Sequence, residues 1–393
     1  MLDMESLEKE ITQRNVATIF EARRLEQRLK NSEKLRVKFG IDPTAPDIHL
    51  GHTVALRKLK LFQEQGHQIV FIVGDVTAMI GDPSGRNETR MPLTHEEIEK
   101  NFSSYRDQVS IFLDISKVEI HRNSEWYEKK GFALLADLLS RVSVQQDLER
   151  DDFQKRIKEG HTISMLEAVY PILQGYDSVE VKADVEVGGT DQMFNMLMGR
   201  RLQRTFNVPE QDIIALEIIE GVDGVKKMSK SYGNYIALSD APEDMFGKIM
   251  SVPDACIGKY FRAFTSIPLL EIETSIGTMH PRDAKMLLAR AVISEIYTKE
   301  KAMAAEQRFS DAFQKKDASK VAEDVFVADG MTTVEFLKKY HGLKSNSEAR
   351  RLLDGGGVHC GKKTLAFDDV ITKKNDGDII KIGKRHFCRI RIV

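Results

Sequence analysis

The chain has 393 residues, of which 41% are hydrophobic and 30% charged, so we expect a water-soluble globular protein with two or three domains. No segment approaches the ~18 consecutive apolar residues of a membrane span, and the acidic start at residues 1–5 is unlike a secretion signal. The three cysteines, Cys256, Cys360 and Cys388, are widely separated. This spacing disfavours a disulfide framework or a cysteine zinc site and favours a reducing cytoplasm.

The net charge of −2 is divided unevenly along the chain. Residues 331–393 contain 14 Lys and Arg against 7 Asp and Glu, a local balance of +7 that leaves −9 on the rest. A basic tail on an acidic body is a common feature of RNA-binding proteins, so this asymmetry favours an RNA partner.

The N-terminal segment, residues 5–31, has a helical pattern. It is rich in Glu, Arg, Leu and Gln, and apolar residues recur at helical spacing at Leu7, Ile11, Val16, Ile19 and Phe20. We therefore expect one long helix over this segment.

A strand–loop–helix–strand pattern follows. Residues 37–41 predict a short strand, the prolines in residues 42–46 predict a loop, and residues 51–65 predict a helix. The continuous apolar run at residues 69–73 is typical of a strand buried on both faces. This order is that of the βαβ unit of a parallel sheet.

Later segments extend this unit into a plan for the whole chain. We expect further strands at residues 118–121, 183–187 and 213–219, and helices at residues 96–113 and 132–139. The predicted fold is α/β, with a Rossmann-like, doubly wound parallel-sheet catalytic domain followed by a helical domain and a small α+β domain. The predicted boundaries are 1–232, with a helical insertion at about 125–180, then 233–329 and 330–393.

The first motif with chemical meaning is Asp42–His52, which reads DPTAPDIHLGH. It lies at the carboxyl end of a predicted strand and enters a helix, whose free N–H groups favour phosphate. Gly51 permits a close approach to the backbone, and His49 and His52 can donate hydrogen bonds to phosphate or ribose oxygens. The alternatives are two ordinary loop histidines or, on weak evidence, a zinc pair.

The second motif is the lysine-rich loop Lys227-Met228-Ser229-Lys230-Ser231. Flexible lysines beside small hydroxyl residues are suited to closing on a polyphosphate, and especially on a leaving pyrophosphate whose charge grows in the transition state. Taken alone, such a loop is more often a solvated surface.

The third motif places Tyr170, Gln174 and Asp177 at i, i+4 and i+7 of a predicted helix, and therefore on one face. Val169, Leu173 and Tyr176 lie on the opposite side and are interpreted as packing residues. A phenol, an amide and a carboxylate in line suit a polar ligand, although the wet face of an amphipathic helix explains them equally well.

Two further segments are weaker signals on their own. Gly188-Gly189-Thr190-Asp191-Gln192 follows a predicted strand and forms a turn at its carboxyl end. The segment 345–353 begins with Ser345 three residues before Glu348, a capping box, and continues as a basic helix followed by short strands at 358–363 and 379–383. The basic helix at 345–353 could neutralise the phosphates of a nucleic acid, or it could be a solvated surface helix with no ligand.

Together, the His-Leu-Gly-His turn and the Lys-Met-Ser-Lys-Ser loop resemble the paired signatures of class I aminoacyl-tRNA synthetases. The Tyr-x-x-x-Gln-x-x-Asp helix and the Gly-Gly-Thr-Asp-Gln turn resemble those of tyrosyl-tRNA synthetases, and residues 330–393 resemble the S-four-like RNA-binding domain. The resemblance runs from about residue 35 to the end. It implies a ligase that activates tyrosine with ATP and then transfers it to the 3′ end of tRNA.

The resemblance also implies roles for individual residues. The catalytic residues on the phosphates and ribose would be Thr44, His49, His52, Lys227 and Lys230. Other ATP contacts would be Pro43, Gly51, Asp191, Met228, Ser229 and Ser231. Tyrosine contacts would be Lys38, Gly40, Asp42, Asp82, Tyr170, Gln174, Asp177 and Gln192. RNA contacts would be Ser345, Arg350, Arg351, Lys362 and Lys363.

One position departs from the better-known pattern of the family. Many members have a tyrosine two residues before the strand glycine, where it contacts the substrate hydroxyl, whereas this chain has Lys38 ahead of Gly40. The sequence leaves open which group shares the substrate phenol with Asp177.

Partners and rivals follow from the same resemblance. We expect L-tyrosine, ATP with Mg²⁺, tRNA(Tyr), no protein-ligated metal, no membrane, a cytoplasmic location and a homodimer formed through the insertion at about 125–180. The apolar run at residues 132–136 suits such an interface, and equally a buried helix. The rival functions are tryptophanyl-tRNA synthetase, a small nucleotidylyltransferase, and a catalytically inactive RNA-binding protein derived from a synthetase.

Overall fold

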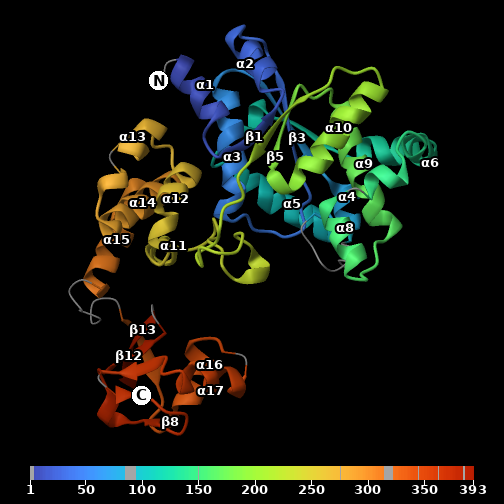
Figure 1. Cartoon of the computed structure of the whole chain (residues 1–393). Helices are drawn as coiled ribbons and strands as arrows, with labels where there is room; N and C mark the ends of the chain where they lie inside the picture. The colour runs from blue at the N-terminus through green and yellow to red at the C-terminus, as the bar shows by residue number, and fades with distance from the viewer. Residues whose placement is uncertain are drawn as a thin grey trace. The chain divides into compact units, whose positions relative to one another are not determined.

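The computed structural model describes residues 4–84, 94–148, 150–274, 276–313, 322–343, 345–361, 363–383 and 386–393 (Figure 1). These residues form two compact units. The first comprises residues 1–240 and 251–288, and the second comprises residues 241–250 and 289–393.

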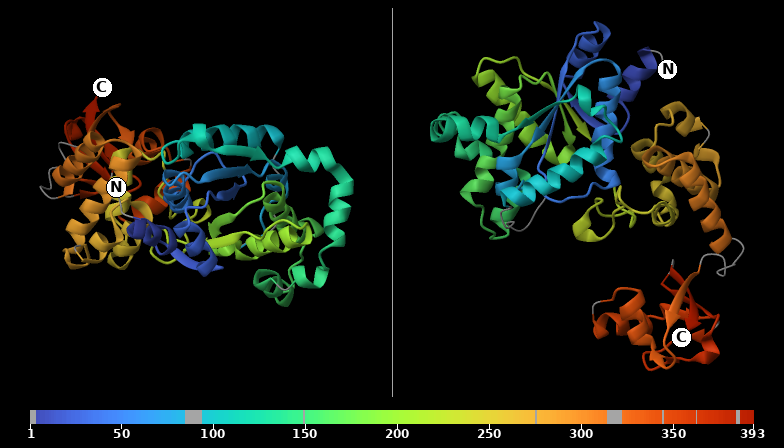
Figure 2. Two further views of the ribbon diagram at one scale, coloured as in Figure 1. Left: turned by 90° about the horizontal axis from the view of Figure 1, so that it is seen from above. Right: turned by 180° about the vertical axis from the view of Figure 1, so that it is seen from behind.

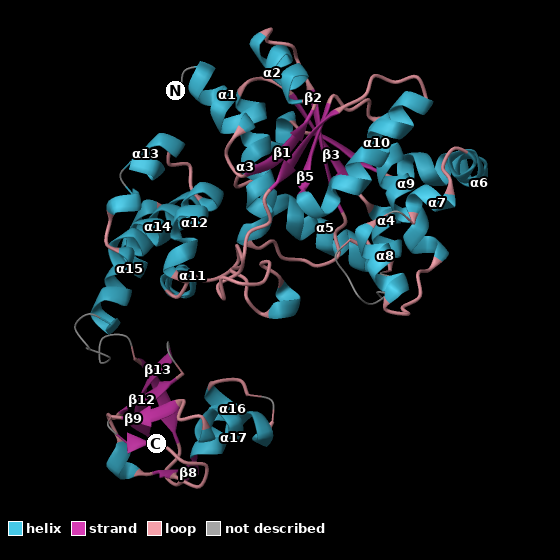
Figure 3. Ribbon diagram, in the orientation of Figure 1, coloured by secondary structure: helices cyan, strands magenta, loops and turns pink. Residues whose placement is uncertain are grey.

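The first unit is built on a six-stranded sheet, drawn as magenta arrows in Figure 3, with the strand order β1-β6-β5-β2-β3-β4. Neighbouring strands are parallel, except that β1 pairs antiparallel with β6. This arrangement confirms the predicted doubly wound α/β fold. The strands are β1 (Val16–Phe20), β2 (Arg36–Ile41), β3 (Gln68–Val73), β4 (Glu119–Arg122), β5 (Val185–Gly189) and β6 (Asp212–Leu216).

Helices cover both faces of this sheet. The face that carries Val70 and Ile72 packs against α6, α9 and α10, whereas α3 packs against β3 and β5. The helices of this unit are α1 (Met4–Thr12), α2 (Ala22–Lys30), α3 (Leu50–Glu64), α4 (Asp75–Ile80), α5 (His95–Val109), α6 (Ser124–Ser140), α7 (Val144–Asp147), α8 (Asp151–Lys158), α9 (Met165–Glu180), α10 (Met193–Thr205), α12 (Ile257–Phe264) and α13 (Leu269–Thr274), with α14 (Pro281–Ile296) passing into the second unit.

The N-terminal segment corrects the prediction of one helix over residues 5–31. It forms α1, β1 and α2, and the breaks fall at Asn15 and Glu21, which have φ angles of 51° and 68°. The run Val-Ala-Thr-Ile-Phe is rich in β-branched residues, and it gains a partner in β6, with Phe20 opposite Ile213. Long-range pairing therefore overrides the helical spacing.

Helices α9 and α10, green in Figure 2, pack side by side because small residues lie between them. A Cβ atom built on Gly175 would lie 2.9 Å from the backbone nitrogen of Gly199. A Cβ atom on Gly199 would lie 3.0 Å from the hydroxyl of Ser178. No larger side chain fits there without movement, so the spacing of the two helices is fixed by these glycines.

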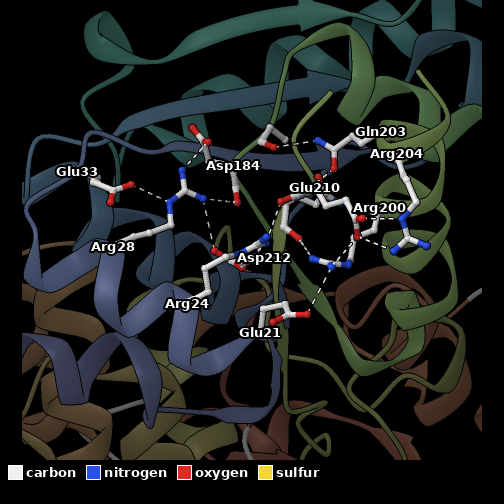
Figure 4. Close-up of polar contacts among 12 residues, drawn as sticks. Glu21, Arg24, Arg28, Glu33, Asp184, Arg200, Gln203, Arg204, Glu210 and Asp212 are labelled. Atoms are coloured by element: carbon white, nitrogen blue, oxygen red, sulfur yellow. Dashed lines mark hydrogen bonds and ion pairs between the residues drawn. The ribbon is translucent and has the colours of Figure 1, made fainter. Parts of the chain in front are cut away.

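Charged side chains at the amino edge of the sheet pair with one another, as Figure 4 shows. Arg28 Nη2 donates to Asp184 Oδ1 at 2.6 Å, and Arg24 Nε donates to Asp212 Oδ1 at 2.7 Å. The arginines come from α2, whereas the carboxylates lie at the beginnings of β5 and β6. These ion pairs therefore tie α2, which follows the edge strand β1, to the parallel strands.

The described residues of the second unit form helices, a five-stranded sheet and a separate two-stranded sheet. Its helices are α11 (Pro242–Met250), α15 (Lys299–Phe313), α16 (Thr333–Tyr340) and α17 (Asn346–Asp354). Its strands are β7 (Glu323–Val327), β8 (Met331–Thr332), β9 (Val358–Cys360), β10 (Lys363–Thr364), β11 (Val370–Ile371), β12 (Ile379–Ile382) and β13 (His386–Ile392). Strand β7 lies within residues 233–329, which we expected to be helical, and pairs with β13.

None of the described helices combines the length and the apolar character needed to cross a membrane.

Candidate active site

A cavity of about 470 Å³ opens at the carboxyl edge of the six-stranded sheet. In open α/β sheets this edge, where the loops after the strands converge, is the usual place for a ligand. The cavity brings together most of the residues that the sequence selected for tyrosine and ATP: Gly40, Asp42, Thr44, His49, Gly51, His52, Asp82, Tyr170, Gln174, Asp177, Asp191, Gln192, Lys227, Met228, Ser229, Lys230 and Ser231.

The loop that follows β2 is held in place by two side chains of α5. Asn101 Nδ2 donates to the carbonyl of Pro43 at 2.8 Å, which accounts for the position of this buried proline behind the cavity wall. The Gln108 side chain accepts from the backbone nitrogen of Ile48 at 2.8 Å and donates to the carbonyl of Pro46 at 3.0 Å. Sequence reasoning missed both α5 residues, since an amide on a helix carries no local signal of its partner.

The two histidines at the start of α3 are held as neutral donors. Burial lowers the pKa of His49 to about 2, helped by His52 and by the nearby Lys230 and Lys227, and burial lowers the pKa of His52 to about 4. The backbone nitrogen of His49 donates to His52 Nδ1 at 3.3 Å. The proton of neutral His52 therefore lies on Nε2, which can donate to a ligand oxygen.

The second signature loop is organised by Asn234, which is almost fully buried. Its Oδ1 accepts from the backbone nitrogen of Ser229 at 2.9 Å, and its Nδ2 donates to the carbonyl of Lys227 at 3.1 Å. The backbone of residues 48–50 also bonds that of residues 236–238, through Leu50 to Ile236 and Leu238 to Ile48, each at 2.9 Å. The backbone around the first signature is thus joined to the stretch of chain that follows the second.

The lysine side chains of this loop contact carboxylates only at long range. Lys227 Nζ lies 3.6 Å from Asp191 Oδ2, and Lys230 Nζ lies 3.7 Å from Asp47 Oδ2. Both lysine side chains are about one third exposed, at 40% and 30%. Such pairs contribute little to stability, so both ammonium groups can move to a phosphate at low cost.

The polar face of α9 lies against the carboxyl end of β2. The hydroxyl of Tyr170 donates to Asp42 Oδ2 at 2.8 Å, and Thr77 Oγ1 donates to Asp42 Oδ1 at 2.7 Å. Burial and the nearby carboxylates raise the pKa of Tyr170 well above its usual range, so it stays a donor. As predicted, Leu173 and Tyr176 on the opposite side of the helix are core residues.

Asp177 sits at the closed end of this face among three donors. Trp126 Nε1 donates at 3.0 Å, Tyr127 OH at 3.1 Å and Asn123 Nδ2 at 3.5 Å. Burial raises the pKa of the Asp177 carboxyl to about 7, against the charge of Lys38 and these hydrogen bonds, which lower it. Sequence reasoning missed the three donors, although Trp126 is the only tryptophan in the chain.

Lys38 lies behind the cavity wall rather than in it. Its side chain is fully buried, and Nζ contacts Ser178 Oγ at 2.7 Å, Glu186 Oε1 at 2.8 Å and the carbonyl of Gln174 at 3.1 Å. These partners flank Asp177 on α9 and the neighbouring strand β5. Lys38 is thus not among the residues that line the cavity, and its charge lowers the pKa of Asp177.

Asp82 and Gln192, which both line the cavity, are hydrogen bonded to each other. Gln192 Nε2 donates to Asp82 Oδ2 at 2.6 Å, and the backbone nitrogen of Ser84 donates to Asp82 Oδ1 at 2.9 Å. Gly85, the last residue of the predicted turn, lies outside the described residues. In the part of the chain that the structure describes, no cluster of three His, Cys, Asp or Glu side chains is arranged to hold a metal ion.

The predicted RNA-contact residues lie on the second unit. Ser345 caps α17 by accepting from the backbone nitrogen of Glu348 at 3.2 Å, and Arg350 and Arg351 are exposed on that helix. Arg350 stacks on the ring of Phe367, and Lys363 Nζ contacts Asp369 at 2.8 Å. Lys362 lies outside the described residues.

Comparisons with known proteins show which family the chain resembles. A family model described as "tRNA synthetases class I (W and Y)" matches residues 30–314. The tyrosine–tRNA ligase of Thermotoga maritima is 45% identical over 97% of this chain and 96% of its own length, and that of Shewanella oneidensis is 42% identical over the full length of both.

Solved structures share the fold at lower identity. A C-terminally truncated mitochondrial tyrosyl-tRNA synthetase from Aspergillus nidulans has a TM-score of 0.66 at 22% identity, covering 79% of this chain and 94% of that one. The Archaeoglobus fulgidus tyrosyl-tRNA synthetase complexed with L-tyrosine has a TM-score of 0.62 at 23% identity, covering 77% of this chain and all of that one.

Proposed function

Since the chain belongs to the class I aminoacyl-tRNA synthetases, and within them to the tyrosine–tRNA ligases, we propose that its carboxyl-edge cavity holds L-tyrosine and ATP side by side. The observation that carries this proposal is that Tyr170, Gln174 and Asp177 face the same cavity as both signature motifs. The phenol end of tyrosine would meet Asp177, and its ammonium would meet Asp82, Tyr170 and Gln174.

The reaction needs alignment and charge stabilisation more than a protein nucleophile. The ionised carboxylate of tyrosine attacks the α-phosphorus of ATP, the bond from that phosphorus to the bridging oxygen breaks, and pyrophosphate leaves as tyrosyl-adenylate forms. The terminal hydroxyl of tRNA then takes the tyrosyl group and releases AMP. Neither step requires a protein side chain to bond to the substrate, so the catalytic power must come from binding the transition state.

The nucleotide end of the cavity supplies charge and donors for this step. Lys227 and Lys230, together with Thr44 and His49, would bind the β- and γ-phosphates, whose negative charge grows as pyrophosphate leaves. The neutral imidazole of His52 would donate to the ribose, and Asp191 would accept from it. We propose that ATP enters as its Mg²⁺ complex, with the metal carried as part of the substrate.

tRNA binding and dimerisation complete the proposal. The basic helix α17, with Arg350 and Arg351, would neutralise tRNA phosphates. A homodimer would form through the insertion, where several large apolar side chains are exposed: Phe132 at 82%, Val144 at 64%, Met165 at 73% and Leu166 at 60%. The predicted division at residues 232 and 329 stands as part of this proposal, as does a cytoplasmic location, where tRNA charging serves protein synthesis.

Amino-acid-dependent exchange of pyrophosphate into ATP tests the central proposal. With purified full-length protein and each of the twenty amino acids, we expect exchange with tyrosine and none above background with tryptophan. Exchange with tryptophan alone, or no exchange with any amino acid, would contradict the proposal. Arg350→Gln combined with Arg351→Gln should leave this exchange unchanged while slowing tRNA charging, and normal charging by that variant would remove α17 from the tRNA surface.

A further inference from the structure

A buried polar side chain to which the proposed reaction gives no role lies behind the two glutamine side chains of the cavity wall, Gln174 and Gln192. Asn195, on α10, is fully buried and does not line the cavity. Its Nδ2 donates to Gln174 Oε1 at 2.9 Å and to Gln192 Oε1 at 3.0 Å. One side chain therefore contacts both amides that face the substrate.

Arg150 holds the other end of Asn195. Arg150 is buried, and its Nη1 donates to Asn195 Oδ1 at 3.2 Å while its Nη2 donates to Ser84 Oγ at 3.1 Å. The guanidinium also stacks on the rings of Phe153 and Phe194, with ring centroids 4.7 and 5.1 Å away. These contacts fix its plane, and so fix the direction from which it donates.

The chemistry of arginine decides how every amide in this network must be turned. A guanidinium can only donate, so Asn195 must present Oδ1 to Arg150. Its Nδ2 is then the atom that faces the two glutamines, and a donor there requires an oxygen from each. Gln174 and Gln192 must therefore both turn Oε1 toward Asn195.

The far end of the network imposes the same orientation independently. An ionised carboxylate can only accept, and Asp82 accepts from Gln192 Nε2 at 2.6 Å. Gln192 is therefore set from both sides, with one Nε2 hydrogen on Asp82 and the second left for a ligand in the cavity. Gln174 keeps one Oε1 lone pair for a ligand, because Asn195 uses the other.

We propose that Asn195, oriented by Arg150, is a positioning residue that sets the donor and acceptor directions of Gln192 and Gln174 for the amino-acid substrate. The free N–H of Gln192 then meets the substrate carboxylate, and the free lone pair of Gln174 meets the ammonium. This inference rests on the proposed function, since it takes tyrosine as the ligand of the cavity.

The test compares two ligands that differ only in the carboxylate. Binding of tyrosine and of tyramine, which has the phenol and the ammonium alone, is measured by calorimetry for the wild type and for Asn195→Asp. The aspartate keeps the shape and the Arg150 contact but offers only acceptors, so Gln192 either keeps its oxygen against a second acceptor or turns that oxygen toward Asp82 and the cavity. Either arrangement weakens its hold on the substrate carboxylate. We expect tyrosine binding to weaken about tenfold more than tyramine binding.

Two further variants test the inference if Asn195→Asp does not fold. Arg150→Met removes the donor that orients Asn195, whereas Arg150→Lys keeps a donor at that position. We expect the tyrosine-to-tyramine affinity ratio to fall in Arg150→Met and to recover at least partly in Arg150→Lys. A residue that only supported the fold would lower both affinities equally and would leave this ratio unchanged.

These measurements can contradict the role of Asn195 without contradicting tyrosine as the ligand of the cavity. If the tyrosine-to-tyramine affinity ratio of Asn195→Asp equals that of the wild type, the inference is overturned and the proposed function stands. Where Asn195→Asp does not fold, the same ratio in Arg150→Met decides in the same way. Wild-type protein that binds neither tyrosine nor tyramine overturns the proposed function, and the inference falls with it. A selective loss of tyrosine binding in the tested variant supports both.

Discussion

At the amino edge of the six-stranded sheet, Asp184 and Asp212 accept from arginine nitrogens at 2.6 and 2.7 Å. At the carboxyl edge, the ammonium groups of Lys227 and Lys230 lie 3.6 and 3.7 Å from their nearest carboxylates. The first edge uses its charges to hold α2 on the sheet. The second edge leaves its lysines weakly held, so that they can bind a ligand whose charge changes during the reaction.

The contrast extends to what each edge should do when a charge is removed. Loss of a charge at the carboxyl edge should alter catalysis or substrate recognition and should not lower stability. Loss of a charge at the amino edge should alter stability and leave catalysis nearly unchanged. Five experiments test this contrast.

The largest effect is expected for Lys230→Ala. Removing an ammonium that stabilises the departing pyrophosphate should slow adenylate formation by about 100-fold or more. The KM for tyrosine and the melting temperature should stay close to those of the wild type, since the Asp47 contact is long and partly exposed. Single-turnover formation of tyrosyl-adenylate measures the rate, and weaker tyrosine binding with a normal rate would contradict the assignment.

Asp177→Ala should act on recognition rather than on rate. The variant loses a charged acceptor for the substrate phenol, and a hydrogen bond to a charged group is worth about 1.5–3 kcal/mol. The preference for tyrosine over phenylalanine in pyrophosphate exchange should therefore fall by about 10- to 100-fold. The KM for ATP serves as the internal control, and an unchanged tyrosine-to-phenylalanine ratio would rule out Asp177 as the phenol partner.

The pH dependence of tyrosine binding should follow the same carboxyl. With a pKa of about 7, Asp177 is about one tenth ionised at pH 6 and about nine tenths ionised at pH 8. The KM for tyrosine should then rise by up to about tenfold as the pH falls from 8 to 6. Asp177→Asn, which does not titrate, should give a flat profile, and a wild-type profile equally flat would be evidence against this pKa.

The ionised form of Asp177, which favours tyrosine binding, lowers the stability of the fold. Because the folded-state pKa of Asp177 is raised, its contribution to stability is fully present below the unfolded-state pKa and is lost as the pH rises through about 7. Asp177→Asn should therefore melt higher than the wild type at pH 8. The difference should shrink toward pH 4, and thermal melts across this range measure it.

The smallest effect is expected at the amino edge. The Asp212 side chain is fully buried between Arg24 and Arg28, whose side chains are 39% and 20% exposed. Burial raises the pKa of Asp212 in spite of these charges, so the informative charge to remove is that of an arginine, whose loss leaves the buried carboxylate less well paired. Arg28→Gln should destabilise the protein by about 1–2 kcal/mol, a screened value because the arginine reaches solvent, with kcat unchanged. Arg204→Gln, at a side chain that is 71% exposed, is the control and should leave the melting temperature unchanged.

Local pattern predicts elements well where the local signal and the tertiary contacts agree. The apolar run at residues 69–73 is strand β3, and the helix expected at residues 51–65 is α3. The N-terminal segment shows the limit of this approach. The spacing of Val16 and Ile19 fits a helix, but the partner that makes this segment a strand, β6, lies far along the chain and leaves no local trace.

The site shows a similar limit. Fixed motifs located the cavity and much of its lining, because the loops after β2, β5 and β6 meet at one edge of the sheet and the motif on α9 faces the same cavity. The side chains that hold those motifs, such as Asn101, Asn195 and Asn234, were not found. An asparagine can serve a turn, a helix cap or a buried network, and only its neighbours in space show which.

The pairing of β1 with β6 also sets an order for biosynthesis. Among the six strands of this sheet, β1 is synthesised before the others but cannot join the sheet until β6 has been made, since Phe20 pairs with Ile213. The contacts of Arg14 form later still, because its guanidinium donates to the backbone carbonyls of Arg262 and Thr265. A nascent chain stopped before β6 would expose a β-branched strand with no edge to join, which is the kind of segment that aggregates or recruits a chaperone.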